Sequence, residues 1–210
     1  MTKEQNEAIK TGSSLPIMEN FYTLQGEGYH SGKAAYFIRL GGCDVGCHWC
    51  DVKESWEVGN HPVLTVEEIV ANAQAQESRF AVITGGEPVM YQLDYLCKKL
   101  IEAGFYLAIE TSGAHPLSGD WHWICLSPKK LKHPKAEFYK KANELKVIIY
   151  NQHDFLWAEE QATKVNEKCK LYLQAEWSVR KKISPQIIKY IKQNPKWQLS
   201  IQSHKYLDIP

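Results

Sequence analysis

Three cysteines within eight residues constrain this chain more than any other feature of its sequence. Cys43, Cys47 and Cys50 lie in the stretch GGCDVGCHWCDVKESW, residues 41–56. Disulfides suit them poorly, because three is an odd number and neighbouring partners would close strained rings of a few residues. The spacing therefore predicts that the thiolates bind a metal group and that a single loop brings them together.

Two kinds of metal group compete for these thiolates. A structural zinc site takes four ligands in a closed tetrahedron, and the nearest further candidates, His48 and Asp51, directly follow Cys47 and Cys50, which makes simultaneous binding awkward. Iron–sulfur clusters are held by thiolates. Three thiolates on a four-iron cluster leave one iron open, which suits a reactive site. The sequence therefore favours a cluster over zinc.

The motifs around these cysteines resemble those of a known family. The C-x3-C-x2-C spacing with Trp49 before the last cysteine resembles the signature of the radical S-adenosylmethionine (SAM) superfamily, and TGGEP at 84–88 resembles its GGEP motif. LQGEG at 24–28, FIRL at 37–40 and QSHK at 202–205 narrow the resemblance to the 7-carboxy-7-deazaguanine synthase family of queuosine and deazapurine biosynthesis. The likeness extends over nearly the whole chain.

Strand-like segments alternate with helical or loop segments, which predicts an α/β fold with a mostly parallel sheet. The resemblance implies a trimmed radical SAM partial (βα) barrel with its site at the carboxyl ends of the strands. We expect strands at 34–40, 80–84, 105–110, 123–126, 144–150, 170–174 and 197–201, and helices at 65–75, 92–103, 154–163 and 185–193.

Two parts of the chain are expected to behave differently. Residues 1–14 are polar and predict a mobile N-terminal arm, and residues 15–210 predict a single radical SAM core domain. The C-terminal tail follows the last strand directly, so it is expected to close on the site. A frayed tail is the alternative.

Composition excludes several classes of protein. The chain is 44% hydrophobic and 23% charged, as globular proteins are, and its net charge of +1 gives no reason to expect binding to nucleic acid or to a membrane. The N-terminus is polar rather than signal-like. Cys97, Cys125 and Cys169 are scattered and read as buried side chains. We therefore expect a cytoplasmic protein in a reducing compartment.

The resemblance implies a [4Fe–4S] cluster on Cys43, Cys47 and Cys50, with SAM on the open iron. Taken alone, the basic run at 128–135 is by default a solvated loop, but Lys129 matches the family segment that holds SAM. The full set of cofactor-binding residues implied in this way is Trp49, Cys50, Asp51, Gly86, Ser127, Pro128, Lys129, Gln174, Ala175, Glu176 and Trp177.

A second set of residues is implied for the substrate. The glycines of LQGEG permit close approach to a ligand, or they make only a tight turn. Arg39 interrupts an apolar strand, where it can clamp a carboxylate or form a structural ion pair. Under the resemblance, the substrate-binding residues are Leu24, Gln25, Gly26, Glu27, Arg39, Thr84, His204 and Pro210, and Ser203 replaces a more usual threonine.

The implied activity is that of a carbon–nitrogen lyase. A 5′-deoxyadenosyl radical made from SAM abstracts a hydrogen from 6-carboxy-5,6,7,8-tetrahydropterin, the ring contracts and ammonia leaves, giving 7-carboxy-7-deazaguanine. The resemblance also implies a homodimer and an electron donor such as flavodoxin or ferredoxin. The family often binds Mg²⁺ through a threonine where this chain has Val52. Asp51 could still bind the ion, Mg²⁺ could bind through substrate and water, or the metal could be dispensable, and we expect weaker or altered Mg²⁺ dependence.

Two alternatives stay open at this point. Another small radical SAM enzyme, such as a glycyl-radical activating enzyme, shares the cysteine loop and the GGEP-like run, but LQGEG and QSHK argue against it. A non-catalytic metal-binding module with structural cysteines belongs to another class. A brown protein that holds about four irons after anaerobic reconstitution and cleaves SAM would exclude that module.

Overall fold

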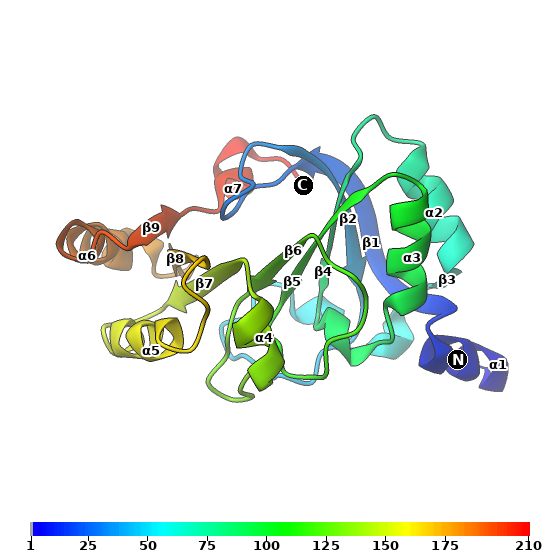
Figure 1. The fold of residues 1–210 in the computed structure, drawn as a ribbon, viewed down its shortest axis with the longest axis horizontal. Helices are drawn as coiled ribbons and strands as arrows, with labels where there is room; N and C mark the ends of the chain where they lie inside the picture. The colour runs from blue at the N-terminus through cyan, green and yellow to red at the C-terminus, as the bar shows by residue number, and fades with distance from the viewer. Residues whose placement is uncertain (1) are drawn as a thin grey trace.

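The computed structural model describes residues 2–210 as one curved, open sheet with helices on its outer side (Figure 1). The sheet has nine strands in the order β3-β1-β2-β4-β5-β6-β7-β8-β9. The strands are β1 (Ser14–Leu24), β2 (Ala34–Leu40), β3 (Val63–Thr65), β4 (Phe80–Gly85), β5 (Tyr106–Thr111), β6 (Trp123–Leu126), β7 (Glu144–Ile149), β8 (Lys170–Ala175) and β9 (Trp197–Ser200).

Every pairing from β2 to β9 is parallel, whereas β1 runs antiparallel to both β2 and β3. The prediction of a mostly parallel, partial barrel is therefore confirmed. The helices are α1 (Lys3–Thr11), α2 (Val66–Gln74), α3 (Asp94–Glu102), α4 (Ala136–Lys141), α5 (His153–Ala162), α6 (Arg180–Gln193) and α7 (Ser203–Leu207).

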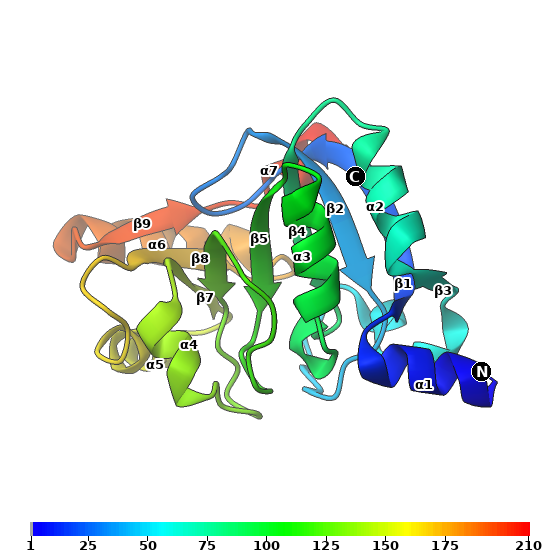
Figure 2. The same cartoon turned by 45° about the vertical axis from the view of Figure 1, so that its right-hand side comes forward.

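The two faces of the sheet carry different side chains, because successive residues of a strand point to opposite faces. On β2, Ile38 and Leu40 belong to the main core, which lies under helices such as α3 and α5. Phe37 belongs instead to a small apolar cluster on the concave face, with Val82 and Ala108. Polar side chains follow on this concave face toward the carboxyl ends of the strands, where they line one cavity. Figure 2 shows β2, β4 and β5 side by side, with α3 in front of them.

Most expected elements agree with the structure to within a few residues. A capping box opens α2: the Thr65 side chain accepts from the Glu68 N–H, and Glu68 Oε2 accepts from the Thr65 N–H at 2.8 Å. The connection from Gly113 to β6 contains no helix, as expected of a trimmed barrel.

Helix α6 begins earlier than predicted. Proline lacks an N–H and is favoured in a first helical turn, so the sequence placed the helix start at Pro185. The helix instead begins at Arg180 and contains Pro185. Ile183 and Ile187, one turn apart, are both buried, and their packing holds residues on both sides of the proline in one helix.

Residues 3–11 of the expected arm form helix α1. Thr2 caps it through a capping box with Gln5, and Gly12 ends it in the left-handed conformation at a φ of 76°. The helix has no buried residue, although Ile9 packs against the core. The mobility of this segment stays a prediction. None of the helices in residues 2–210 is long and apolar enough to cross a membrane.

Candidate functional site

A cavity of about 340 Å³ opens where the parallel strands end, and it collects nearly all the residues singled out in the sequence. The predicted residues that line it are Leu24, Gln25, Gly26, Glu27, Arg39, Cys43, Cys47, Trp49, Cys50, Asp51, Val52, Thr84, Gly86, Ser127, Lys129, Gln174, Ala175, Glu176, Trp177, His204 and Pro210. Pro128 is buried and is not among the lining residues. Motifs far apart in sequence therefore meet in one place.

The cysteine loop leaves β2 and is fixed by backbone hydrogen bonds at its base. Cys43 N donates to Trp56 O at 3.2 Å, and Cys50 N donates to Cys47 O at 3.1 Å. All three thiols are free and half-buried. Burial raises the pKa of the Cys43 and Cys47 thiols, so a metal that replaces the protons would have to supply the compensating charge.

The spacing of these thiols bears on the choice of metal group. Within residues 2–210, no three His, Cys, Asp or Glu side chains converge closely enough to hold one metal ion. A zinc ion needs its ligands about 2.0–2.3 Å from a single point. The thiolates of a four-iron cluster each bind a different iron and therefore do not need to converge on one point.

Gly85, the last residue of β4, packs on Leu40 at the end of β2, and Gly86 packs on the cysteine loop. Gly86 N donates to Leu40 O at 3.0 Å, and Glu87 N donates to Gly42 O at 2.9 Å. A Cβ atom on Gly86 would lie 2.1 Å from Gly42 O and 2.9 Å from Cys43 Cβ. The glycines are therefore needed for close backbone approach, and the GGEP-like run sets the position of the first cysteine.

Glu87 joins the GGEP-like run to the end of β5 through hydrogen bonds. Its side chain is 1% exposed and accepts hydrogen bonds from the hydroxyls of Thr111 and Ser112 and from Ser112 N, the last at 2.8 Å. Carboxylates buried in this way need such donors to offset their desolvation. Thr111 and Ser112, at the end of β5, thus fix Glu87, and the backbone of Glu87 in turn binds the cysteine loop at Gly42.

The C-terminal segment closes on the LQGEG loop. Ser203 N and Ser203 Oγ both donate to Gly26 O, at 3.0 and 2.9 Å. The ring of His204 lies against Gly26, where a Cβ atom would come within 2.2 Å of Nδ1. Burial lowers the pKa of His204. The structure thus places the tail over the cavity, as helix α7 followed by Pro210.

Arg39 forms the structural ion pair, which is one of the two roles that the sequence left open. Its Nε donates to Glu19 Oε1 at 2.6 Å, between residues paired across β1 and β2, and its guanidinium lies 5.7 Å from the Phe21 ring. The structural ion pair is therefore present. Arg39 also lines the cavity, where its remaining N–H groups suit an anionic ligand.

Lys129 lies on the opposite side of the cavity. Its Nζ donates to Ser127 O and Ser127 Oγ, both at 2.7 Å, and lies 5.7 Å from the Trp49 ring. Burial lowers the pKa of Lys129. The Glu176 carboxylate accepts hydrogen bonds from the N–H groups of Ser178 and Val179 just before α6, so it stabilises the backbone at the start of that helix.

Sequence reasoning missed the charged floor of the cavity. Lys146 on β7 contacts Glu27 Oε2 and lies 2.9 Å from Glu110 Oε2. Neither Glu110 nor Lys146 was predicted as a site residue. The available signal was a lysine inside the apolar run of β7, the same kind of interruption that drew attention to Arg39.

Asp51 and Val52 occupy the place of the proposed Mg²⁺ ligands. Asp51 Oδ2 accepts from Lys205 Nζ and from Gln202 Nε2, the latter at 3.3 Å. Burial alone would raise the pKa of Asp51, but the hydrogen bond and charge of Lys205 outweigh it and lower the pKa. Val52 lines the cavity without an oxygen atom in its side chain.

Comparisons with known proteins agree with these observations. A family model described as the radical SAM superfamily matches residues 37–132. A 7-carboxy-7-deazaguanine synthase from Flavobacterium psychrophilum is 56% identical over 210 residues, which is 100% of both chains. A protein of the same name from Synechocystis sp. is 52% identical over 93% of this chain and 94% of its own.

A solved structure extends the agreement to three dimensions. The crystal structure of QueE from Escherichia coli matches with a TM-score of 0.81 at 30% sequence identity, covering 96% of this chain and 99% of that chain. Sequence similarity and fold similarity therefore both run from end to end. The chain belongs to the 7-carboxy-7-deazaguanine synthase family of the radical SAM superfamily.

Proposed function

We propose that this protein contracts the ring of 6-carboxy-5,6,7,8-tetrahydropterin to 7-carboxy-7-deazaguanine with loss of ammonia, as a radical SAM lyase of queuosine and deazapurine biosynthesis. One observation carries the proposal: the cysteine loop, the SAM segments and the substrate loop line a single cavity. Family membership supports the same activity.

Cys43, Cys47 and Cys50 are the proposed ligands of a [4Fe–4S] cluster. When bound, the cluster and SAM supply a carbon radical that removes a hydrogen atom from the substrate. The chain's own contribution is placement. Gly86 and Lys129, with the segments 127–129 and 174–177, are proposed to bind SAM, and the closed tail is proposed to keep water away from the reacting atoms.

The substrate is proposed to lie on the LQGEG loop. Arg39 is placed to receive its carboxylate through parallel hydrogen bonds. Leu24, Gln25, Gly26 and Glu27 are proposed to line the ring, and Thr84, His204 and Pro210 to contact it from the other sides of the cavity.

The residues present fit a divalent cation poorly. Mg²⁺ takes near-octahedral oxygen ligands, but Val52 offers none and Asp51 already accepts from Lys205 and Gln202. No proposed step passes through Mg²⁺. A homodimer, an electron donor such as flavodoxin or ferredoxin and a cytoplasmic location are proposed on family membership and on the cysteine content.

Anaerobic turnover tests the proposal directly. The reconstituted protein would be incubated with SAM, a reductant and 6-carboxytetrahydropterin, and the product followed by mass. We expect 7-carboxy-7-deazaguanine from the wild type and none from Cys47→Ala. SAM cleavage without this product would mean that the enzyme acts on a different substrate. A protein with an intact, reducible cluster that does not cleave SAM would favour the non-catalytic module.

A further inference from the structure

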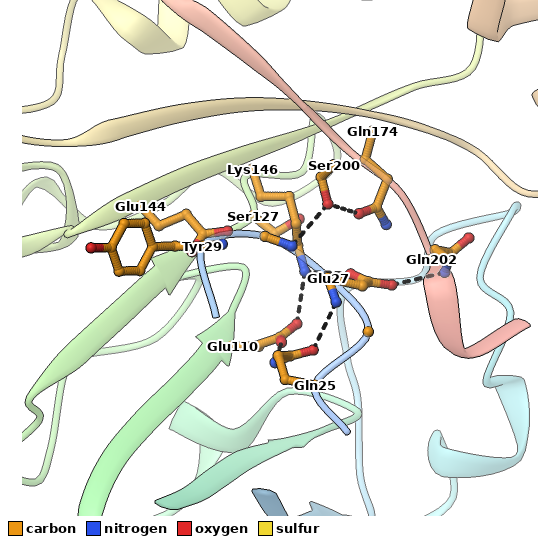
Figure 3. A network of polar contacts seen from close by, with 12 residues as sticks. Gln25, Glu27, Tyr29, Glu110, Ser127, Glu144, Lys146, Gln174, Ser200 and Gln202 are labelled. Carbon is orange, nitrogen blue, oxygen red and sulfur yellow. Dashed lines mark hydrogen bonds and ion pairs between the residues drawn. The ribbon is translucent and has the colours of Figure 1, made fainter. Parts of the chain in front are cut away.

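Lys146 is a buried cation held between two carboxylates at the floor of the cavity (Figure 3). Its side chain is 4% exposed, while those of Glu27 and Glu110 are 14% and 22% exposed. Lys146 and Ile148 point to the concave face because they alternate with the core residues Leu145 and Val147 along β7. Burying a charge is costly unless it is paired, so this arrangement needs all three groups.

The other carboxylate oxygens are also occupied, each by an amide from a different segment. Gln25 Nε2 donates to Glu110 Oε1 at 2.8 Å, and Gln202 Nε2 donates to Glu27 Oε1 at 2.9 Å. Gln25 belongs to the LQGEG loop and Gln202 directly precedes α7. Lys146 is therefore connected, through one carboxylate each, to the substrate loop and to the C-terminal segment.

The charges explain why a lysine is needed. Two neighbouring buried carboxylates repel each other, and one of them would take up a proton. Burial alone would raise the pKa of Glu27, but the charge and hydrogen bond of Lys146 outweigh it and lower that pKa from 4.5 to about 2. The same contacts raise the pKa of Lys146 despite its burial. Glu27 thus remains an acceptor at neutral pH.

Other titratable groups surround this trio on the neighbouring elements. Those whose charges act on Lys146 or on its two partners are Cys125, Lys129, Glu144, Asp51 and His204. Glu144 is directed away from the trio, since its Oε2 accepts from Trp123 Nε1 at 3.0 Å and from Tyr29 N at 3.2 Å. Lys146 alone contacts both Glu27 and Glu110 among the cations of residues 2–210.

We propose that Lys146 is a positioning residue for the substrate: it holds Glu27 and Glu110 side by side as hydrogen-bond acceptors for N–H groups of the reduced pterin ring. Through Glu27 it also holds Gln202, and with it the segment that covers the cavity. This inference rests on the proposed function. A reduced pterin presents several N–H donors at its edges, which is the chemistry that paired carboxylate acceptors recognise.

Lys146→Met tests this role, because methionine keeps the length of the stem and removes the charge. We expect the KM for the pterin to rise about tenfold or more, the size of effect expected when hydrogen bonds to charged groups are lost. Uncoupled SAM cleavage and iron content should remain near wild type. KM should also become pH-dependent, because the burial that raises the pKa of Glu27 is then no longer offset by Lys146.

Three further variants keep the test decisive. Lys130→Met is the matched control, because Lys130 pairs with Asp154 and does not line the cavity. Lys146→Arg should recover part of the affinity, since it restores the charge. Lys146→Met/Glu110→Gln should weaken the new pH dependence without restoring KM, since the repulsion between the two carboxylates is removed while Glu27 stays buried. It also provides an alternative if the single variant does not fold.

Several outcomes would overturn the inference. An unchanged KM with an unchanged pH profile in folded Lys146→Met would do so, as would an equal loss of SAM cleavage, iron content and turnover, which would mean general structural support. A wild type that cleaves SAM but does not convert the pterin would instead reject the proposed function, and this inference with it.

Discussion

Gly86 leaves no room for a side chain against Gly42, because a Cβ atom on Gly86 would lie 2.1 Å from the Gly42 carbonyl oxygen. The contact joins the turn after β4 to the residue before the first cysteine. Backbone cannot yield as a flexible side chain can, so any substituent at Gly86 has to push the cysteine loop outward. The GGEP-like run therefore shapes the cysteine loop.

Gly86→Ala is expected to impair cluster binding. Overpacking a tight site costs about 1–3 kcal/mol, and here the strain falls on Cys43, whose Cβ would lie 2.9 Å from the new methyl group. We predict less iron per chain after anaerobic reconstitution and proportionally less SAM cleavage. Gly59→Ala is the control, since nothing lies within 4 Å of a Cβ atom there. Wild-type iron content in Gly86→Ala would contradict the prediction.

Gly26→Ala is expected to displace the C-terminal segment. The new Cβ atom would lie 2.2 Å from His204 Nδ1, so the ring and the helix that carries it must move away. We predict greater hydrogen exchange in residues 201–210 and a rise of about tenfold in the KM for the pterin, equivalent to about 1.4 kcal/mol. SAM cleavage without substrate should persist.

A double variant separates steric displacement from general damage. In Gly26→Ala/His204→Ala the imidazole ring is gone and only the contact with the Cβ of residue 204, at 3.0 Å, remains. Hydrogen exchange in residues 201–210 should therefore return most of the way toward that of His204→Ala alone. If the double variant instead exchanges as fast as Gly26→Ala, contact with His204 is not what holds the segment closed.

Local patterns sufficed for much of this fold. The strand over residues 34–40 follows from its aromatic and branched residues, and the helix after Thr65 follows from its capping box. The cysteine loop could be placed because it leaves that strand directly. Each of these signals lies within a short stretch of chain, because residues close in sequence determine where such strands, helix caps and loops form.

Features that depend on distant contacts were harder to predict. Lys146 meets Glu27 across 119 residues of sequence, and no local pattern names that partner. Alternation along β7 could still have shown that Glu144, Lys146 and Ile148 share one face. Helix α1 has the sequence of a capping box at Thr2 and Gln5, but without a buried face it resembles a polar arm.

The pair formed by Asp51 and Lys205 bears on metal dependence. The ammonium of Lys205 already provides a positive charge at the carboxylate, and Val52 supplies no oxygen. We predict that turnover by the wild type responds weakly to Mg²⁺, and that Val52→Thr responds more strongly because it restores an oxygen ligand. Product formation would be measured with Mg²⁺ and with a chelator. Identical responses from the two proteins would count against the prediction.

His30 is a buried side chain whose protonation should change the free energy of unfolding. Its side chain is 6% exposed, and within the part of the chain that the structure describes neither ring nitrogen has a hydrogen-bond partner. The ring packs edge-on against Phe80 and Trp123. Burial, helped by the charge of Lys33, lowers the pKa of His30 from 6.5 to about 4.

His30→Phe should therefore stabilise the protein most in acid. The unfolded chain protonates His30 below its ordinary pKa of 6.5, whereas the folded chain does not until about 4. Wild type consequently loses stability as the pH falls through that interval, and phenylalanine keeps the ring contacts without the titration.

Denaturant unfolding at about pH 8 and about pH 5 should show the stability gain of the variant growing toward acid. His153→Phe, at the exposed start of α5, should show no such growth. Curves that stay parallel for His30→Phe and wild type would mean that His30 is protonated, or hydrated, in the folded protein.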